Sequence, residues 1–188
     1  TILVASTPLT PAFADGGAVP PQSESGEGRA LEQADDGKYY ISTAEELKEF
    51  ADKVNDDSGE YTDIDAELTD DIDLSEICSE EKGDSWTPIG NSEESAYIGT
   101  FNGNGKTISG LYIYTAANIK AFGYVGTDGT DGTVQNLSVS GSVSGKINVG
   151  GVVGLNRGSV EDCDLQAALP AASVCRRRCG VYGGTVEN

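Results

Sequence analysis

The chain has 188 residues, of which 31 are acidic and 12 are basic, so its formal net charge is −19. This charge argues against binding to nucleic acid, which needs clustered Lys and Arg, and against binding to an anionic membrane surface. The chain contains no histidine, which excludes Ser-His and Cys-His nucleophilic pairs and His-based zinc sites.

Residues 1–14 are interpreted as the end of a secretory signal peptide. Their apolar start is followed by Ala12-Phe13-Ala14, which fits the small-x-small cleavage pattern; the alternative is a disordered N-terminus. Residues 15–38 are rich in Gly, Ser, Glu, Pro and Asp, which predicts a disordered linker. No apolar run reaches the roughly 18 residues that a membrane-spanning helix needs. The sequence therefore predicts a secreted or cell-surface protein with no membrane span in this chain.

Residues 39–60 are predicted to form a capping strand and a capping helix. Thr43 can be the helix N-cap, and Glu46 can complete a capping box. Apolar side chains then follow at helical spacing, which places them on one face: Leu47, Phe50, Ala51 and Val54. Such a helix would cover the open end of a solenoid, where unpaired strand edges would otherwise be exposed.

Short elements are expected next. Residues 61–75 alternate acidic and apolar side chains, which predicts two short strands. Residues 76–97 are predicted to be an irregular excursion. Residues 101–106 contain two Asn-Gly pairs, which predict a turn because both residue types tolerate positive φ.

One sequence unit recurs at a spacing of 26 residues, as Thr107-Ile108, Thr133-Val134, Ser159-Val160 and Thr185-Val186. Further residues match at the same spacing: Leu111 with Leu137 and Cys163, Ile113 with Val139, and Asn136 with Asp162 and Asn188. A fixed period of this length with frequent glycine is typical of a solenoid. Residues 61–188 are therefore predicted to be β-helix repeats with a coil period of about 26, and Asn136, Asp162 and Asn188 to form an inward polar ladder at the turns.

Two glycine-flanked segments, 123–126 and 151–154, are predicted to be equivalent buried strands. They lie 28 residues apart, so the first of these coils is expected to carry two extra residues, most simply in the loop 127–132. Insertions in a solenoid belong on loops.

The repeat pattern disappears between residues 164 and 180. Arg176-Arg177-Arg178 would occupy a position where buried glycine and valine stand one coil earlier, and buried charge is costly. We hypothesise that this segment is out of frame; the alternative is a genuine Arg-rich insertion. Four cysteines in an exported protein suggest disulfides, but Cys175 and Cys179 lie in this segment and are assigned no function.

The segment Val149–Cys163, VGGVVGLNRGSVEDC, closely resembles the GLUG motif, a short repeat of bacterial secreted and cell-surface proteins that also occurs in the non-catalytic parts of IgA-specific metallopeptidases. Upstream segments resemble the usual preface of such proteins, at 40–47, 71–74, 86–90 and 99–111. The resemblance covers about residues 39–163 and 181–188. It implies a right-handed parallel β-helix, mainly β, and no catalytic residues.

Acidic residues supply weak calcium candidates. Asp70, Asp71 and Asp73, with Asp63 and Asp65 nearby, offer oxygen ligands, and a second set lies in a possible loop at Asp128 and Asp131. The EF-hand spacing is absent, and solvent-facing acidic positions and a simple Asp-Gly turn are the alternatives. No other cofactor is expected.

Exposed aromatic residues are the predicted ligand-binding positions. Thr107–Tyr114 is predicted to be a strand with Leu111 and Ile113 on one face and Tyr112 and Tyr114 on the other, outward face. Exposed rings can stack on sugars or on partner side chains. Two further residues would extend this patch: Trp86 and Tyr97. The alternative is that these rings pack beneath the 76–97 excursion.

Together these patterns favour a non-catalytic structural or adhesion module of an exported bacterial surface protein. Its partner would be an extracellular carbohydrate or a host or cell-surface protein, bound on the solenoid flank by a monomer or a repeat array. The alternative is an accessory or substrate-binding part of a larger carbohydrate-active enzyme or metallopeptidase.

Overall fold

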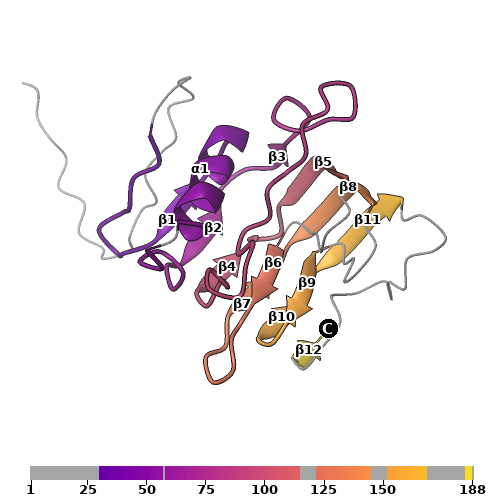
Figure 1. Ribbon diagram of the computed structural model, residues 1–188. Coiled ribbons are helices and arrows are strands. Elements are labelled where there is room, and N and C mark those ends of the chain that lie inside the picture. Colours follow the sequence, from indigo (N-terminus) through magenta and orange to yellow (C-terminus); the bar gives the residue numbers. More distant parts are fainter. Residues whose placement is uncertain (1–29, 57, 115–121, 145–151, 169–184, 188) are drawn as a thin grey trace, which may run out of the picture.

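The computed structural model describes residues 30–56, 58–114, 122–144, 152–168 and 185–187. Within these ranges the chain forms a mainly β solenoid of about three turns, with one short helix, α1 (Ala44–Val54), at its N-terminal end (Figure 1). The predicted β-solenoid is thus confirmed. Its strands belong to three parallel sheets: β1 (Tyr39–Ile41), β2 (Ala66–Leu68), β4 (Thr100–Asn102), β7 (Thr133–Gln135), β10 (Ser159–Glu161) and β12 (Thr185–Glu187) in the first; β3 (Ile72–Asp73), β5 (Thr107–Tyr114), β8 (Ser138–Ser144) and β11 (Asp164–Ala168) in the second; β6 (Phe122–Val125) and β9 (Val153–Asn156) in the third.

The coils β4–β6 and β7–β9 each visit the three sheets in turn, and a sharp corner joins the first sheet to the second. The corner residues Asn136 and Asp162 have φ values of 53° and 46°, which Asn and Asp tolerate better than most residues. Their side chains are exposed, so the predicted inward polar ladder is wrong for these two. The feature that recurs is the backbone conformation, because the chain must turn within two residues here.

The spacing of 26 holds only for the later coils. Ser159 pairs with Thr133, and Thr185 pairs with Ser159, each 26 positions apart. The proposed fourth member, Thr107-Ile108, is wrong, because it lies in β5 of the second sheet. Thr100 is the residue that pairs with Thr133. A strand in each of the first two sheets begins with threonine and a hydrophobic residue, Thr100-Phe101 in the first and Thr107-Ile108 in the second, so the pattern alone does not identify the sheet.

Extra residues in the earlier coil explain the change in spacing. Strands β6 and β9 pair with Phe122 opposite Val153, 31 positions apart, so the equivalence of 123–126 with 151–154 is wrong by three residues. The extra residues do lie mainly in the expected loop, 127–132, where Thr127 and Thr130 form a bridge. The expected number of two is wrong, because the spacing of 31 exceeds 26 by five residues. The matches of Leu111 with Leu137 and of Ile113 with Val139 are also wrong, since Leu111 pairs with Gly141 and Ile113 with Val143.

Apolar side chains fill the solenoid interior as one stack per sheet. Phe101, Val134 and Val160 pair successively in the first sheet and are each 0% exposed. The other two sheets contribute similar buried rows: Ile72, Ile108 and Val139 in the second, and Ile89, Phe122 and Val153 in the third. Because each coil is too small to bury its own apolar face, stacking provides the core.

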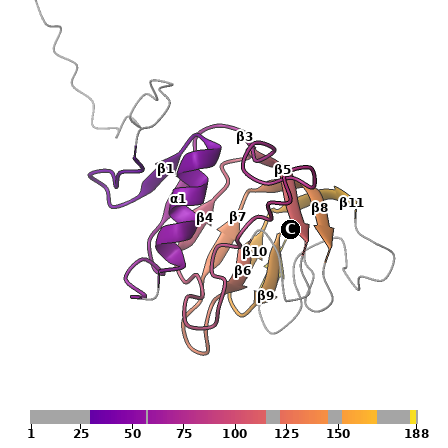
Figure 2. The ribbon, with the colours of Figure 1, turned by 45° about the horizontal axis from the view of Figure 1, so that its top comes forward.

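The helix α1 forms where the local signals predict it. The Thr43 hydroxyl accepts a hydrogen bond from the Glu46 N–H at 3.2 Å, and the Glu46 carboxylate accepts one from the Thr43 N–H at 3.2 Å. This confirms the capping box. The predicted apolar stripe is the buried one, and α1 lies beside β1 and β4 at one end of the solenoid (Figure 2).

Aromatic rings join α1 to the first coil. The Phe50 ring is 0% exposed, and its centroid lies 6.1 Å from Tyr39, 6.0 Å from Tyr97 and 5.9 Å from Phe101. The Phe101 ring in turn lies 5.0 Å from Phe122. Rings at these separations attract one another beyond simple burial, so α1 is part of the core.

Replacement of the helix cap tests the contribution of α1's first turn. Thr43→Ala removes a hydroxyl that satisfies an otherwise unpaired helix N–H, and we expect it to lower the free energy of unfolding by about 1 kcal/mol. Urea denaturation followed by far-UV circular dichroism measures this change. Thr130→Ala, in an exposed loop, is the control and should have almost no effect.

Two predicted segment boundaries differ from the structure. Residues 30–38, expected in the linker, pack against α1: Leu31 is 5% exposed, and its N–H donates to Glu49 Oε2 at 2.9 Å. Composition misses this because one apolar side chain is enough to dock the segment. The frame-shift hypothesis began at residue 164, yet Asp164–Ala168 pairs in register with β8.

The remaining predictions for the termini fall outside the described residues. These are the signal peptide (1–14), the linker up to residue 29, the segment 169–180 with its Arg run, and Asn188. Residues 61–75 do contain two short strands, β2 and β3, and the described residues 76–97 form only isolated bridges. In the described part of the chain, no helix has the length and apolarity needed to cross a membrane.

Candidate binding surface on the solenoid flank

The four aromatic candidates fall into two groups. Tyr114 is 69% exposed and Tyr112 is half-buried, whereas Trp86 is 4% exposed and Tyr97 is 0% exposed. The expectation that Trp86 and Tyr97 extend an exposed patch is therefore wrong. The alternative interpretation, packing within the 76–97 excursion, describes both.

Tyr97 is held inside the molecule by its hydroxyl and its ring. The hydroxyl donates to the Ile64 carbonyl at 2.8 Å, and the ring centroid lies 6.1 Å from that of Phe122. Burial raises the pKa of Tyr97 well above its ordinary value, with a smaller contribution from Asp65. Its backbone pairs with Val125 of the third sheet, so Tyr97 takes the place of a strand residue in the first coil.

A β-bulge at Gly110 sets the direction of the two outward tyrosines. Gly110 has a φ of 67°, and the pairing register with β8 shifts between Ile108 and Leu111. A Cβ at Gly110 would lie 2.6 Å from Asp73 Oδ1, so only glycine fits. The bulge inserts one residue, which keeps Leu111 inside and Tyr112 outside. The predicted facing is confirmed, although strict alternation from Ile108 would have reversed it.

The excursion runs along the edge of β5 next to these tyrosines. The Trp86 N–H donates to the Tyr112 carbonyl at 2.9 Å, and the Tyr114 N–H donates to Ser85 Oγ at 3.2 Å. On the other side of β5, Tyr112 pairs with the exposed Ser142. The small serine leaves the tyrosine rings uncovered on that side.

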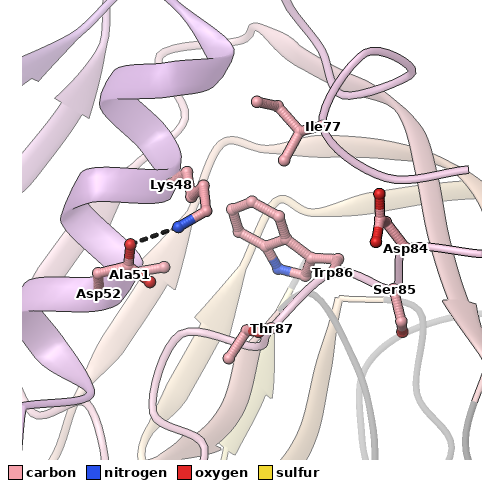
Figure 3. Close-up of a pocket in the computed structure, with 8 residues that line it drawn as sticks. All are labelled: Lys48, Ala51, Asp52, Ile77, Asp84, Ser85, Trp86 and Thr87. Atoms are coloured by element: carbon pink, nitrogen blue, oxygen red, sulfur yellow. Dashed lines mark hydrogen bonds and ion pairs between the residues drawn. The ribbon is translucent and has the colours of Figure 1, made fainter. Parts of the chain in front are cut away.

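A hollow of about 290 Å³ lies between α1 and the excursion (Figure 3). Trp86 and Ile77 form its apolar wall, and the Lys48 amine is held by Asp52 Oδ2 at 2.5 Å. The remaining lining residues are Ala51, Asp84, Ser85 and Thr87. We call this the Trp86 hollow. Sequence reasoning missed Lys48, Asp52 and Asp84. The spacing of Lys48 and Asp52 indicates only an ordinary i,i+4 ion pair, and Asp84 carries no local signal.

An acidic side chain, Glu80, lies near Tyr112. Partial desolvation raises the pKa of Tyr112, and the neighbouring Glu80 carboxylate and Tyr114 contribute in the same direction. The Tyr112 hydroxyl therefore stays protonated at neutral pH and can donate a hydrogen bond. Nearby, Lys82 is paired with Glu76 at 2.9 Å.

The calcium candidates do not come together. Asp71 Oδ1 accepts the Thr107 N–H at 2.7 Å, and Asp73 Oδ1 accepts the Ser75 N–H at 3.0 Å, so both carboxylates fasten backbone corners. Asp70 is exposed, Asp128 lies 3.5 Å from Arg157 Nε, and Asp131 is exposed. The described residues contain no group of three potential metal ligands.

The two described cysteines are free thiols. Cys78 is buried at the Gly110 bulge, where its sulfur accepts the Tyr112 N–H at 3.4 Å. Cys163 is partly buried, and desolvation raises its pKa to about 11. Both thiols are therefore protonated at neutral pH and poorly reactive. Cys175 and Cys179 lie outside the described residues.

Comparison with known proteins gives one curated relative. The chain is 34% identical to halomucin from Haloquadratum walsbyi over 131 residues, which is 68% of this chain and 1% of halomucin. The chain thus spans about 1% of the length of the relative it matches. No family model matches the chain. No solved structure matches it either.

Proposed function

We propose that this chain is a non-catalytic structural or adhesion module of an exported surface protein, and that its solenoid flank binds a carbohydrate or protein partner. The observation that carries the proposal is Tyr114, a large aromatic side chain of β5 that is 69% exposed. Tyrosine is enriched at protein interfaces, because its ring supplies a large apolar area and its hydroxyl supplies a hydrogen bond.

The module is proposed to be a right-handed, GLUG-type β-helix with a coil period of about 26. Right-handedness is the strong preference for connections between parallel strands of one sheet. The segment that resembles the GLUG motif contains β9, the corner Arg157-Gly158 and β10. A Cβ at Gly158 would lie 2.0 Å from the Gly132 carbonyl oxygen of the preceding coil. This close approach explains why the motif has a glycine at position 158.

Export and modularity have separate support. The Ala12-Phe13-Ala14 pattern fits signal-peptide cleavage, and a net charge of −19 favours solubility on an exposed surface. The match to a small fraction of halomucin's length supports a unit embedded in a longer protein.

Removal of the exposed ring tests the binding role. Tyr114→Ala should weaken binding to a partner found by glycan-array or cell-surface screening by at least about tenfold, because aromatic residues dominate interface energetics. Binding is measured by surface plasmon resonance, and the melting temperature should not change. Tyr124→Ala, at a partly exposed tyrosine of β6, is the control and should retain affinity. Equal loss in both variants, or no glycan or protein ligand in either screen, would remove the binding part of the proposal.

A further inference from the structure

We propose that the Trp86 hollow accepts a cationic side chain, a guanidinium or an ammonium group, from a basic segment of a partner protein. This inference rests on the proposed function of the flank and commits it to a protein partner. It is argued from the size, charge and surroundings of the hollow.

The size of the hollow fits one side chain. Its volume of about 290 Å³ lies at the lower limit of pockets that bind small ligands, roughly 300 Å³. A chain of sugar residues would need a longer groove. An arginine or lysine side chain enters as a narrow stem with a charged end, and arginine is among the residues most enriched at interface centres.

The walls supply an apolar surface for the stem. Trp86 is 4% exposed and Ile77 is partly buried, so both are fixed in place by the surrounding core. In Figure 3 the Trp86 indole lies between Lys48 on α1 and Asp84 on the excursion. Because only 4% of Trp86 is exposed, the indole gives the stem a small apolar contact, and the charge of the incoming group is recognised by Asp84.

The charges of the lining leave one excess negative charge. The Lys48 amine is already paired with Asp52 at 2.5 Å, so these two neutralise each other. Asp84 is exposed, and no described basic side chain lies within ion-pair distance of its carboxylate. A guanidinium entering beside Trp86 would provide that partner. The net charge of −19 would also draw basic partners toward the chain.

The hollow lies beside the strand that carries Tyr112 and Tyr114. Ser85 lines the hollow and accepts the Tyr114 N–H at 3.2 Å, and the Trp86 N–H donates to the Tyr112 carbonyl at 2.9 Å. A partner segment with its cationic side chain in the hollow would therefore place neighbouring residues on Tyr112 and Tyr114. This gives the partner two contacts on one flank.

The chain's single tryptophan reports on the hollow directly. We would titrate the full chain with hexa-arginine and follow the fluorescence of Trp86. We expect a saturable change in emission. Asp84→Asn keeps the shape of the side chain but removes its charge, and it should weaken hexa-arginine binding by about tenfold, as loss of a charged hydrogen bond does. Asp84→Lys should abolish it.

The matched control is Asp131→Asn, which removes an exposed carboxylate in the 127–131 loop. It should change the affinity by less than about twofold, since long-range attraction between exposed charges is screened by salt. Melting temperatures of all variants should equal that of the unmodified chain. Equal weakening by Asp84→Asn and Asp131→Asn would mean general charge attraction and would overturn the proposal.

A neutral oligosaccharide is the opposing probe. If chitohexaose gives a saturable change in Trp86 fluorescence and hexa-arginine gives none, the hollow is a sugar site and the proposal is wrong. If neither ligand changes the emission while Tyr114→Ala still weakens binding to a screened partner, this inference fails and the proposed function stands. If neither ligand changes the emission and Tyr114→Ala does not weaken binding, both this inference and the proposed function are wrong.

Discussion

Phe50→Ala should lower the free energy of unfolding by about 3–5 kcal/mol, the range found when a buried aromatic ring is truncated. The ring is 0% exposed and packs against three other aromatic residues: Tyr39, Tyr97 and Phe101. Domains of this kind are typically stable by only about 5–15 kcal/mol in total. The loss would therefore be visible as a large fall in the urea midpoint, measured by far-UV circular dichroism.

Tyr114→Ala is the control for Phe50→Ala, because it removes an aromatic ring that is 69% exposed. Its effect on the free energy of unfolding should stay within about 0.5 kcal/mol. A cost below about 1 kcal/mol for Phe50→Ala would mean that α1 unfolds separately from the coils. In that case the helix would be an appendage, and its aromatic contacts would not hold the solenoid end.

Gly158→Ala should destabilise the protein by about 3 kcal/mol or more, at the upper end of the range for overpacking. The added Cβ would lie 2.0 Å from the carbonyl oxygen and 2.7 Å from the nitrogen of Gly132. Both are backbone atoms of the preceding coil, and the Gly132 carbonyl also accepts the Ser159 N–H at 2.8 Å. The coils would have to separate locally, because no side chain can move aside.

Gly105→Ala separates this steric effect from backbone strain. Gly105 has a φ of 72°, and a Cβ there would meet nothing within 4 Å. Its replacement should lower the free energy of unfolding by only about 1–2 kcal/mol, the cost of a non-glycine residue with a left-handed backbone conformation. Thermal unfolding of the two variants measures the difference. If both substitutions cost the same, the close approach of Gly158 to Gly132 is relieved by small shifts and does not fix the coil spacing.

Local signals predict the elements whose structure depends on near neighbours in the chain. The α1 boundaries follow from the Thr43–Glu46 capping box and from the apolar spacing Leu47, Phe50 and Val54. The outward direction of Tyr112 and Tyr114 follows from alternation within the end of β5. In each case the interacting groups lie within a few residues, so the pattern contains the information.

Long-range pairing is where the prediction of register fails. Thr107-Ile108 and Thr100-Phe101 are equally good strand starts. Only the pairing of Thr100 with Thr133 shows that Thr100-Phe101 belongs to the first sheet. Loop residues such as Thr127–Asp131 change the coil length without altering any strand. A motif spacing read along the chain therefore identifies a solenoid but not which strands are neighbours.

The candidate site was predicted in part for a similar reason. Tyr114 was found because exposure follows from strand alternation, whereas the burial of Trp86 and Tyr97 depends on distant partners, namely β5 for Trp86 and Phe122 for Tyr97. The Trp86 hollow brings together α1 and residues 77–87, two segments with no shared motif. Its charged residues, Lys48, Asp52 and Asp84, resemble ordinary surface positions until the fold places them together.

The one-dimensional pairing order of the strands affects how the molecule would carry a mechanical load. Among the described strands, β7 pairs only with β4 and β10, and β8 pairs only with β5 and β11, so the sheets join each described coil to its immediate neighbours. The aromatic contacts of α1 fasten the N-terminal end. Under tension, coils should detach singly from the opposite side of the described stack, each releasing its own length of chain. The protein would then extend in steps and absorb work at each step.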